Sequence, residues 1–134
     1  MNEYEEIREA IDTYLMKRFK YRSLVRLTPD NIVTTRRNSR IDLYLRIRRI
    51  KCLFPPDCLI IARISFKKER IGHGSHFVRF LAETALKYGY RHIGIESTNH
   101  KSKAFAEKLG FQSIDGSNYA VTVNNLIEYF QDKD

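Results

Sequence analysis

The sequence predicts a single α/β domain in which helices flank a central sheet of mixed strand direction. Three observations indicate this class. An amphipathic helix opens the chain, three or so strand-like stretches with hairpin signals follow, and the second half alternates between strand and helix. The 134 residues are enough for one domain with its own core, and 43% hydrophobic and 30% charged residues are typical of a globular protein.

The first half favours antiparallel pairing. Residues 3–19 place apolar side chains on one helical stripe, with acids early and bases late, which complements the helix dipole. Residues 23–28 and 31–36 lie either side of a Pro-Asp-Asn turn signal and form one bent strand or two short ones. Residues 41–50 alternate apolar and polar, so one face is buried, and a Phe-Pro-Pro-Asp turn joins them to an apolar strand at 58–66 as a hairpin.

The second half contains a parallel pair. A turn with two glycines leads from the strand at 58–66 into a helix over 74–88, and residues 92–97 form the next strand. A strand–helix–strand unit of this kind favours parallel strands joined by a right-handed crossover. A short helix over 100–110, a strand at 119–123 and a final short helix complete the chain. The sequence therefore predicts a mixed, mostly antiparallel sheet and one domain over 1–134.

The net charge and the cysteine content indicate which classes of partner and which cellular compartment to expect. The net charge of +8 favours anionic partners, whether nucleic acid, phosphorylated cofactors or acidic substrates. No apolar run approaches the roughly 20 residues of a membrane helix, and the acidic N-terminus lacks the apolar region of a signal peptide. We expect a cytoplasmic protein, in which Cys52 and Cys58 stay free thiols although they flank the Pro-Pro turn. The four histidines do not combine with them at a zinc-site spacing, so no metal is predicted.

The glycine turn, "KKERIGHGSHF", is the first candidate site. Gly72 and Gly74 precede a helix whose first N–H groups have no intrahelical partner, which is an arrangement that binds anions. Glycine also serves simply to turn the chain. A P-loop needs a different spacing and a following Lys-Ser/Thr, and a dinucleotide fold needs a third glycine where Phe77 stands, although Glu96 lies about where its ribose-binding acid belongs.

Two motifs together resemble one family. The glycine turn resembles the pyrophosphate-binding motif Arg/Gln-x-x-Gly-x-Gly/Ala of the GNAT (Gcn5-related N-acetyltransferase) superfamily, with Glu69 at the first position and Arg70 beside it. "NHKSKAFAEKLGF", residues 99–111, aligns without a gap with the family's "N-P-x-A-x-x-L-Y-E-K-L-G-F" segment. The resemblance covers residues 58–123 and implies a short, divergent member, whose N-terminal half is shorter than usual.

The resemblance implies a cofactor site in which acetyl-CoA, as acyl donor, lies between the two parallel strands where they splay apart. It implies that the pyrophosphate binds the backbone amides of the glycine turn, that the strand before the turn pairs with the pantetheine arm, and that an asparagine contacts that arm. The residues that it assigns to this site are Ala62, Arg63, Ile64, Arg70, Ile71, Gly72, His73, Gly74, Ser75 and Asn99.

The catalytic acid and base of the family are only partly present in this sequence. The family's usual acid, a tyrosine, is replaced by Ala106, and nothing in the sequence places Tyr44 or Tyr119 at the sulfur instead. Glu96, near the end of its strand, is the candidate base, with a solvated or salt-bridged glutamate as the alternative. His73 and His100 are interpreted as polar turn or surface residues rather than bases.

The first half of the chain is strongly basic between residues 17 and 51. The candidate anion or nucleic-acid surface consists of Arg36, Arg37, Arg46 and Arg48. The alternative is a solvated face whose charges protect a sheet edge. Two functions follow: an acetyl-CoA-dependent N-acetyltransferase acting on the primary amine of an unknown acceptor, or a catalytically degenerate GNAT-like domain that binds nucleic acid or a protein partner through this basic half.

Overall fold

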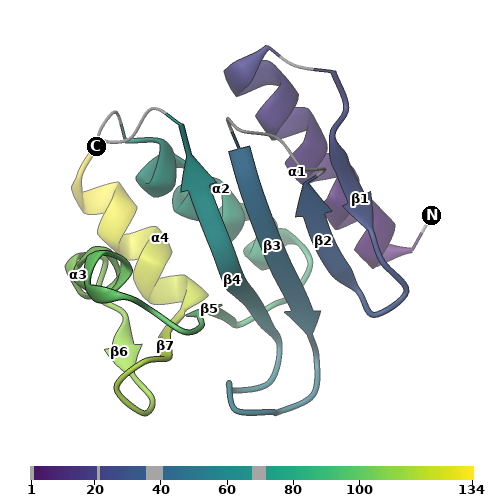
Figure 1. The fold of residues 1–134 in the computed structure, drawn as a ribbon. Helices are drawn as coiled ribbons and strands as arrows, with labels where there is room; N and C mark the ends of the chain where they lie inside the picture. Colours follow the sequence, from purple (N-terminus) through teal and green to yellow (C-terminus); the bar gives the residue numbers. More distant parts are fainter. Residues whose placement is uncertain (1, 21, 36–40, 68–71) are drawn as a thin grey trace.

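The computed structural model describes residues 2–20, 22–35, 41–67 and 72–134. These form a seven-stranded sheet and four helices (Figure 1). In chain order the elements are α1 (Glu3–Phe19), β1 (Val25–Leu27), β2 (Ile32–Thr35), β3 (Ile41–Arg48), β4 (Cys58–Phe66), α2 (His73–Lys87), β5 (His92–Ile95), α3 (His100–Lys108), β6 (Gln112–Ser113), β7 (Tyr119–Thr122) and α4 (Val123–Asp132).

The sheet has the order β1-β2-β3-β4-β5-β7-β6, and every neighbouring pair is antiparallel except β4 and β5. This confirms the predicted mixed α/β fold with one parallel pair. The stretch that was predicted to form one bent strand or two short ones forms two, Val25–Leu27 and Ile32–Thr35. The two-residue strand β6 was not predicted, because so short a segment has no readable alternation.

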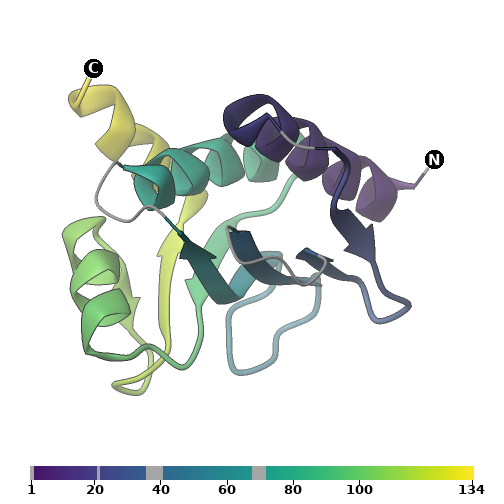
Figure 2. The ribbon, with the colours of Figure 1, turned by 45° about the horizontal axis from the view of Figure 1, so that its top comes forward.

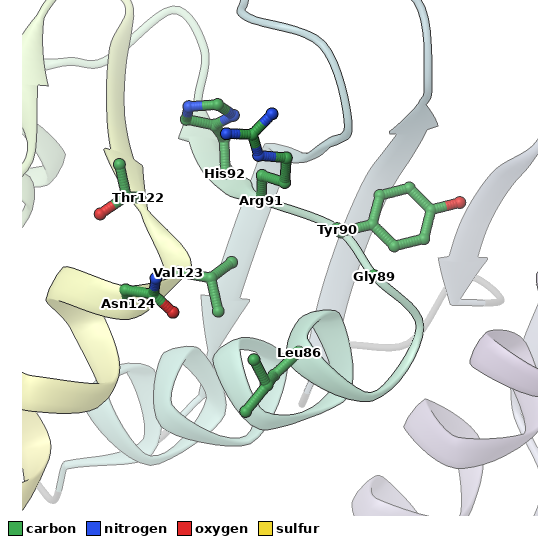
Figure 3. A pocket seen from close by; sticks show the side chains of 8 residues that line it. All are labelled: Leu86, Gly89, Tyr90, Arg91, His92, Thr122, Val123 and Asn124. Atoms are coloured by element: carbon green, nitrogen blue, oxygen red, sulfur yellow. The ribbon is translucent and has the colours of Figure 1, made fainter.

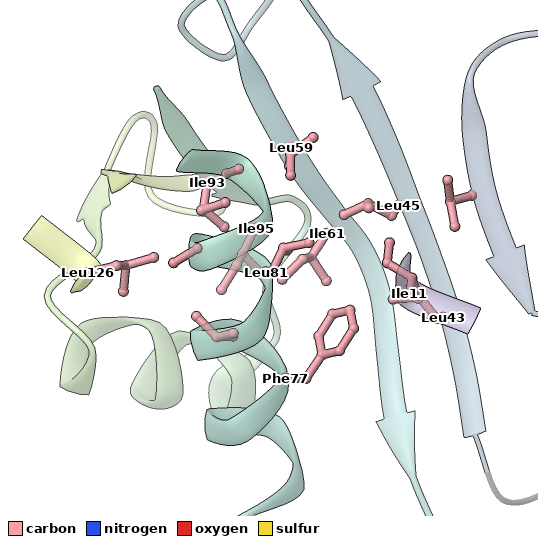
Figure 4. Packing of buried hydrophobic residues seen from close by; sticks show 14 of the residues in the cluster. Ile11, Leu43, Leu45, Leu59, Ile61, Phe77, Leu81, Ile93, Ile95 and Leu126 are labelled. Atoms are coloured by element: carbon pink, nitrogen blue, oxygen red, sulfur yellow. The ribbon is translucent and has the colours of Figure 1, made fainter. Parts of the chain in front are cut away.

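One face of the sheet carries the main core. α1 and α2 lie on that face, as Figure 2 shows, and the alternate residues Ile41, Leu43, Leu45 and Ile47 of β3 are buried against them. Figure 4 shows Phe77 and Leu81 of α2 among these strand residues. The fixed period of each element, 3.6 in the helix and 2 in the strand, brings the apolar stripes together.

The loop between β3 and β4 covers part of the other face. Its Phe54 is buried with Cys58 and Ile60 in a second, smaller cluster. A Cβ on Gly94 of β5 would lie 2.6 Å from the Phe54 ring, so only glycine lets this ring sit on the sheet. Both cysteines are free, and burial raises the pKa of the Cys58 thiol. No described helix is long and apolar enough to cross a membrane.

A buried carboxylate joins α1 to the first strand. Asp12 is 4% exposed, and its Oδ1 accepts hydrogen bonds from the backbone amides of Leu24 (3.1 Å) and Val25 (3.2 Å). Its Oδ2 accepts from the Ser23 hydroxyl and from Arg8. The charge is compensated on every side, and the chain is thereby held at the start of β1.

We expect Asp12→Ala to lower the free energy of unfolding by about 3 kcal/mol, because two buried amides lose their acceptor and Arg8 loses an ion-pair partner. Urea denaturation measures this. Glu9→Ala, an exposed change on the same helix, is the control and should change stability by less than about 0.5 kcal/mol. Equal effects of the two substitutions would contradict the role given to Asp12.

Candidate functional site

The parallel pair separates after four residues. β4 and β5 are paired from Cys58 and His92 to Ile61 and Ile95, and the Glu96 amide makes one more bond to the Ile61 carbonyl at 3.0 Å. β4 nevertheless continues to Phe66, paired with β3 on its other side. Residues 62–66 therefore have no described strand partner on the β5 side, and their edge there is open to a ligand.

Hydrogen bonds to the turn before β7 direct the chain after β5 away from β4. Ser97 has a left-handed backbone (φ 51°), and its amide donates to Asn118 Oδ1 at 2.8 Å. The Thr98 amide donates to the Ser117 carbonyl at 2.7 Å. Asp115 holds the acceptor in place, because its carboxylate accepts from both the backbone and the side-chain amide of Asn118 at 2.9 Å. The side-chain hydrogen bond from Asn118, with backbone bonds in support, lowers the pKa of Asp115.

A β-bulge on β4 lies at the level where the pairing with β5 ends. Tyr44 of β3 pairs with Arg63, but Leu45 pairs with Ile61, so Ala62 is an extra residue in the ladder. A bulge bends its strand and increases the local twist. The bend coincides with the end of the β5 pairing, so both strands turn apart at one level of the sheet.

The N-terminus of α2 follows β4 after the glycine turn. Its N-cap is Gly72, with φ 77° and no side-chain hydrogen bond to the helix, whereas Asn2, Asn99 and Thr122 cap the other helices with their side chains. The N-cap residue thus contributes no side-chain acceptor to the first turn of α2, and the helix dipole adds positive potential there. Arg70 and Ile71, which were also predicted to bind the pyrophosphate, lie outside the described residues, as does Glu69.

Two predicted residues of this first turn also have packing roles. His73 Nδ1 accepts a hydrogen bond from Arg18 Nε at 3.0 Å, and its ring lies 4.7 Å from Phe19 and 5.4 Å from Phe66, measured between ring centroids. A Cβ on Gly74 would lie 3.4 Å from the Phe105 ring of α3. The contact of Arg18 with His73 was not predicted, because a contact between residues 55 positions apart has no local signal in the sequence.

Asn99 and Ala106 frame α3. Asn99 Oδ1 accepts from the Ser102 amide at 2.9 Å, and Ser102 Oγ accepts from the Asn99 amide at 2.9 Å, which is a capping box. Ala106 is fully buried in the main core. Tyr119 is also buried there, at 2% exposed, so it belongs to the core rather than to an open site.

Glu96 lies in a hollow on the sheet face away from α1 and α2. This charged hollow has a volume of about 250 Å³ and is lined by Tyr44, Arg46, Ala62, Arg63, Glu96 and Ser97. Arg46 Nε donates to Glu96 Oε1 at 2.8 Å, with 34% of the arginine and 25% of the glutamate side chain exposed. This hydrogen bond raises the pKa of Arg46. The structure therefore has Glu96 in an ion pair, and its role as a base stays a prediction.

The other predicted anion-binding residues are less free than their sequence suggests. Arg48 donates to the Asp30 carbonyl at 3.0 Å. Arg36 and Arg37 lie outside the described residues. Arg63, which was predicted to bind the cofactor, donates from Nε to Asp42 Oδ2 at 2.6 Å. Glu96 and Asp42 thus compensate the charges of Arg46 and Arg63.

A further hollow of about 250 Å³ lies at the opposite end of β5 (Figure 3). The residues that line it are Leu86, Gly89, Tyr90, Arg91, His92, Thr122, Val123 and Asn124. None of the predicted site residues is among them, so it is separate from the β4–β5 splay.

The splayed parallel pair, the bulge beside it and the helix that follows β4 define a GNAT-like domain. Two solved structures are similar. One is a mutant of the AtaT toxin bound to the C-terminus of the antitoxin AtaR, with a TM-score of 0.56, 17% identity and coverage of 77% of this chain and 71% of that one. The other is the KacTA–DNA complex, with a TM-score of 0.56, 19% identity and coverage of 92% and 86%. No protein-family model matches the chain, and no curated protein sequence matches it significantly.

We expect the splay to loosen at acid pH. Because the pKa of Asp115 is lowered in the folded state, its contribution is complete above the ordinary value of 3.8 and is lost as the pH falls through the lower, folded value. The amide of Ser97, which depends on Asn118, should then lose protection from hydrogen exchange. In Asp115→Ala this protection should already be low at neutral pH, while the exposed Asp132→Ala should keep the pH response. Unchanged protection in Asp115→Ala would contradict the assignment.

Proposed function

We propose that the protein is an N-acetyltransferase that transfers an acetyl group from acetyl-CoA to the primary amine of an acceptor. The observation that carries the proposal is the open edge of β4 at residues 62–66, which ends at a helix N-terminus without a side-chain cap. The reaction class is supported by the two sequence motifs at residues 69–74 and 99–111 that resemble those of the GNAT superfamily. The fold that the chain shares with the AtaT toxin and the KacTA complex agrees with it. Bound acetyl-CoA supplies a thioester whose carbonyl carbon an amine can attack.

The chain's own groups suit the two parts of such a donor. Backbone N–H and C=O groups of Ala62, Arg63 and Ile64 would pair with the amides of a pantetheine arm, as an added strand pairs with a sheet edge. The amides of His73, Gly74 and Ser75 would bind a pyrophosphate, because they lie in the first turn of α2 and Gly72 brings no side chain between them and the ligand. Asn99, which caps α3, is proposed to contact the arm as well.

The catalytic contribution of the protein is mainly positional. Holding an amine against a thioester converts a bimolecular reaction into an effectively unimolecular one. Glu96 is the proposed base, since it follows the last residue of β5 and lines the charged hollow at the splay. With Ala106 buried at the usual tyrosine position, no phenol acts from α3.

We expect acetyl-CoA to stabilise the protein against thermal unfolding, by about 2.7 kcal/mol at a concentration 100 times its Kd. Ser75→Asp should abolish this stabilisation, because the new carboxylate lies at the third position of α2 and repels a pyrophosphate. The same change favours the helix dipole, so the free protein should remain at least as stable. Differential scanning fluorimetry with and without acetyl-CoA measures both effects.

Asn125→Asp is the matched control, because it makes a similar change at the third position of α4. It should leave the acetyl-CoA stabilisation intact. Absence of any stabilisation of the native chain would refute the proposed function, and equal stabilisation of Ser75→Asp would refute the assigned pyrophosphate site.

A further inference from the structure

We infer that the charged hollow binds the acceptor, and that the acceptor is a small amine carrying an anionic group, a carboxylate or a phosphate, close to its nitrogen. The inference rests on the proposed function and names the substrate class of the same site. The position of the hollow supports it. Ala62 and Ser97, which line it, are the residues at which β4 and β5 part, so the hollow adjoins the strand edge proposed for acetyl-CoA.

The charges of the hollow complement such a molecule. Arg46 and Arg63 place their guanidinium carbons 5.1 Å and 5.4 Å from the centre of the Tyr44 ring, and Glu96 lies beside Arg46. Both guanidinium groups line the hollow near the Tyr44 ring, so they would bind a carboxylate or phosphate there while the ring supports the apolar part of the molecule. The glutamate would then face the ammonium group of the same molecule.

The existing ion pairs are exchangeable. Both the Arg46–Glu96 and the Arg63–Asp42 pairs are partly exposed, with 55% of the Arg63 and 39% of the Asp42 side chain accessible. Ion pairs at this exposure contribute little to stability. An acceptor with both charges would therefore replace the Arg46–Glu96 contact by two contacts, one to each of these side chains.

The exchange would also release the base. Once Arg46 binds the anion of the acceptor, the Glu96 carboxylate no longer faces that guanidinium, and its oxygens can accept a hydrogen bond from the ammonium group whose proton Glu96 is to take. An amine without an anion leaves the Arg46–Glu96 pair in place. Selection for anionic amines thus acts on the reaction as well as on binding.

The proton and electron balance of this step closes. The ammonium group of the acceptor gives one proton to Glu96, and the neutral nitrogen forms a bond to the acetyl carbonyl carbon. The carbon–sulfur bond breaks with its electron pair on sulfur, and the second proton of the nitrogen passes to that thiolate. The products are the acetamide and CoA thiol, and Glu96 then releases its proton to solvent.

The size of the hollow limits the acceptor. Its volume of about 250 Å³ is below the roughly 300–1,000 Å³ of sites for drug-sized ligands. An amino acid or a phosphorylated short-chain amine fits this space.

The test uses three probes of matched length: β-alanine, O-phosphoethanolamine and ethanolamine. Each is titrated into the ¹⁵N-labelled protein without acetyl-CoA, and the backbone shifts of Tyr44 and Ser97 report binding. The acetylated product is then measured by mass spectrometry with acetyl-CoA present. We expect one or both anionic amines to bind at least about tenfold more tightly than ethanolamine and to be acetylated with a correspondingly lower KM. The two anionic arms distinguish a carboxylate from a phosphate.

Arg46→Gln and Arg63→Gln should each weaken the anionic probes by about tenfold, and neither should weaken ethanolamine. Arg79→Gln is the control, because Arg79 is also ion-paired, with Asp134, and does not line the hollow. Equal binding of all three probes, or no binding of any, overturns the inference while leaving the acetyl-CoA stabilisation unaffected. Absence of that stabilisation overturns the proposed function instead.

Discussion

The hydrogen bond from the Ser97 amide to Asn118 ends the pairing of β4 with β5. A strand that continued straight would satisfy the backbone groups of residues 62–66 and close the edge. Because Ser97 adopts a left-handed backbone and Asp115 fixes its acceptor, the chain instead turns toward β7. The open edge, the start of α3 and the position of Glu96 all depend on this divergence.

The two sides of the divergence carry different chemistry. After the glycine turn, the available groups are backbone amides at the N-terminus of α2. Such amides bind a pyrophosphate whatever chemical group is attached to it. On the exposed sheet face, the groups are the side chains of Tyr44, Arg46, Arg63 and Glu96, which would distinguish one small molecule from another. Donor binding would therefore depend on backbone geometry, and acceptor choice on four replaceable side chains.

The sequence predicts the elements better than their contacts. The alternation from Ile41 to Ile47 and the apolar stripe of α2 predict the buried faces, and the strand–helix–strand order predicts the parallel pair, because both signals are local. Contacts such as Arg46–Glu96 are 50 positions apart and depend on sheet register and on the bulge at Ala62. The same reasoning explains why Arg46 was predicted to belong to an anion-binding surface and its ion pair with Glu96 was not predicted.

The missing phenol at position 106 is a smaller obstacle than it first looks. An ordinary thiol has a pKa of about 8.5, so expelling a thiolate at neutral pH without an acid costs about 2 kcal/mol relative to the protonated product. Effective molarities from good positioning are worth several times that amount. The harder task is to deprotonate an ammonium group, for which Glu96 must leave its ion pair with Arg46. In this domain the reaction rate would therefore depend on how well the anionic group of the acceptor displaces Glu96 from Arg46. Recognition of the acceptor would then be part of the catalytic step.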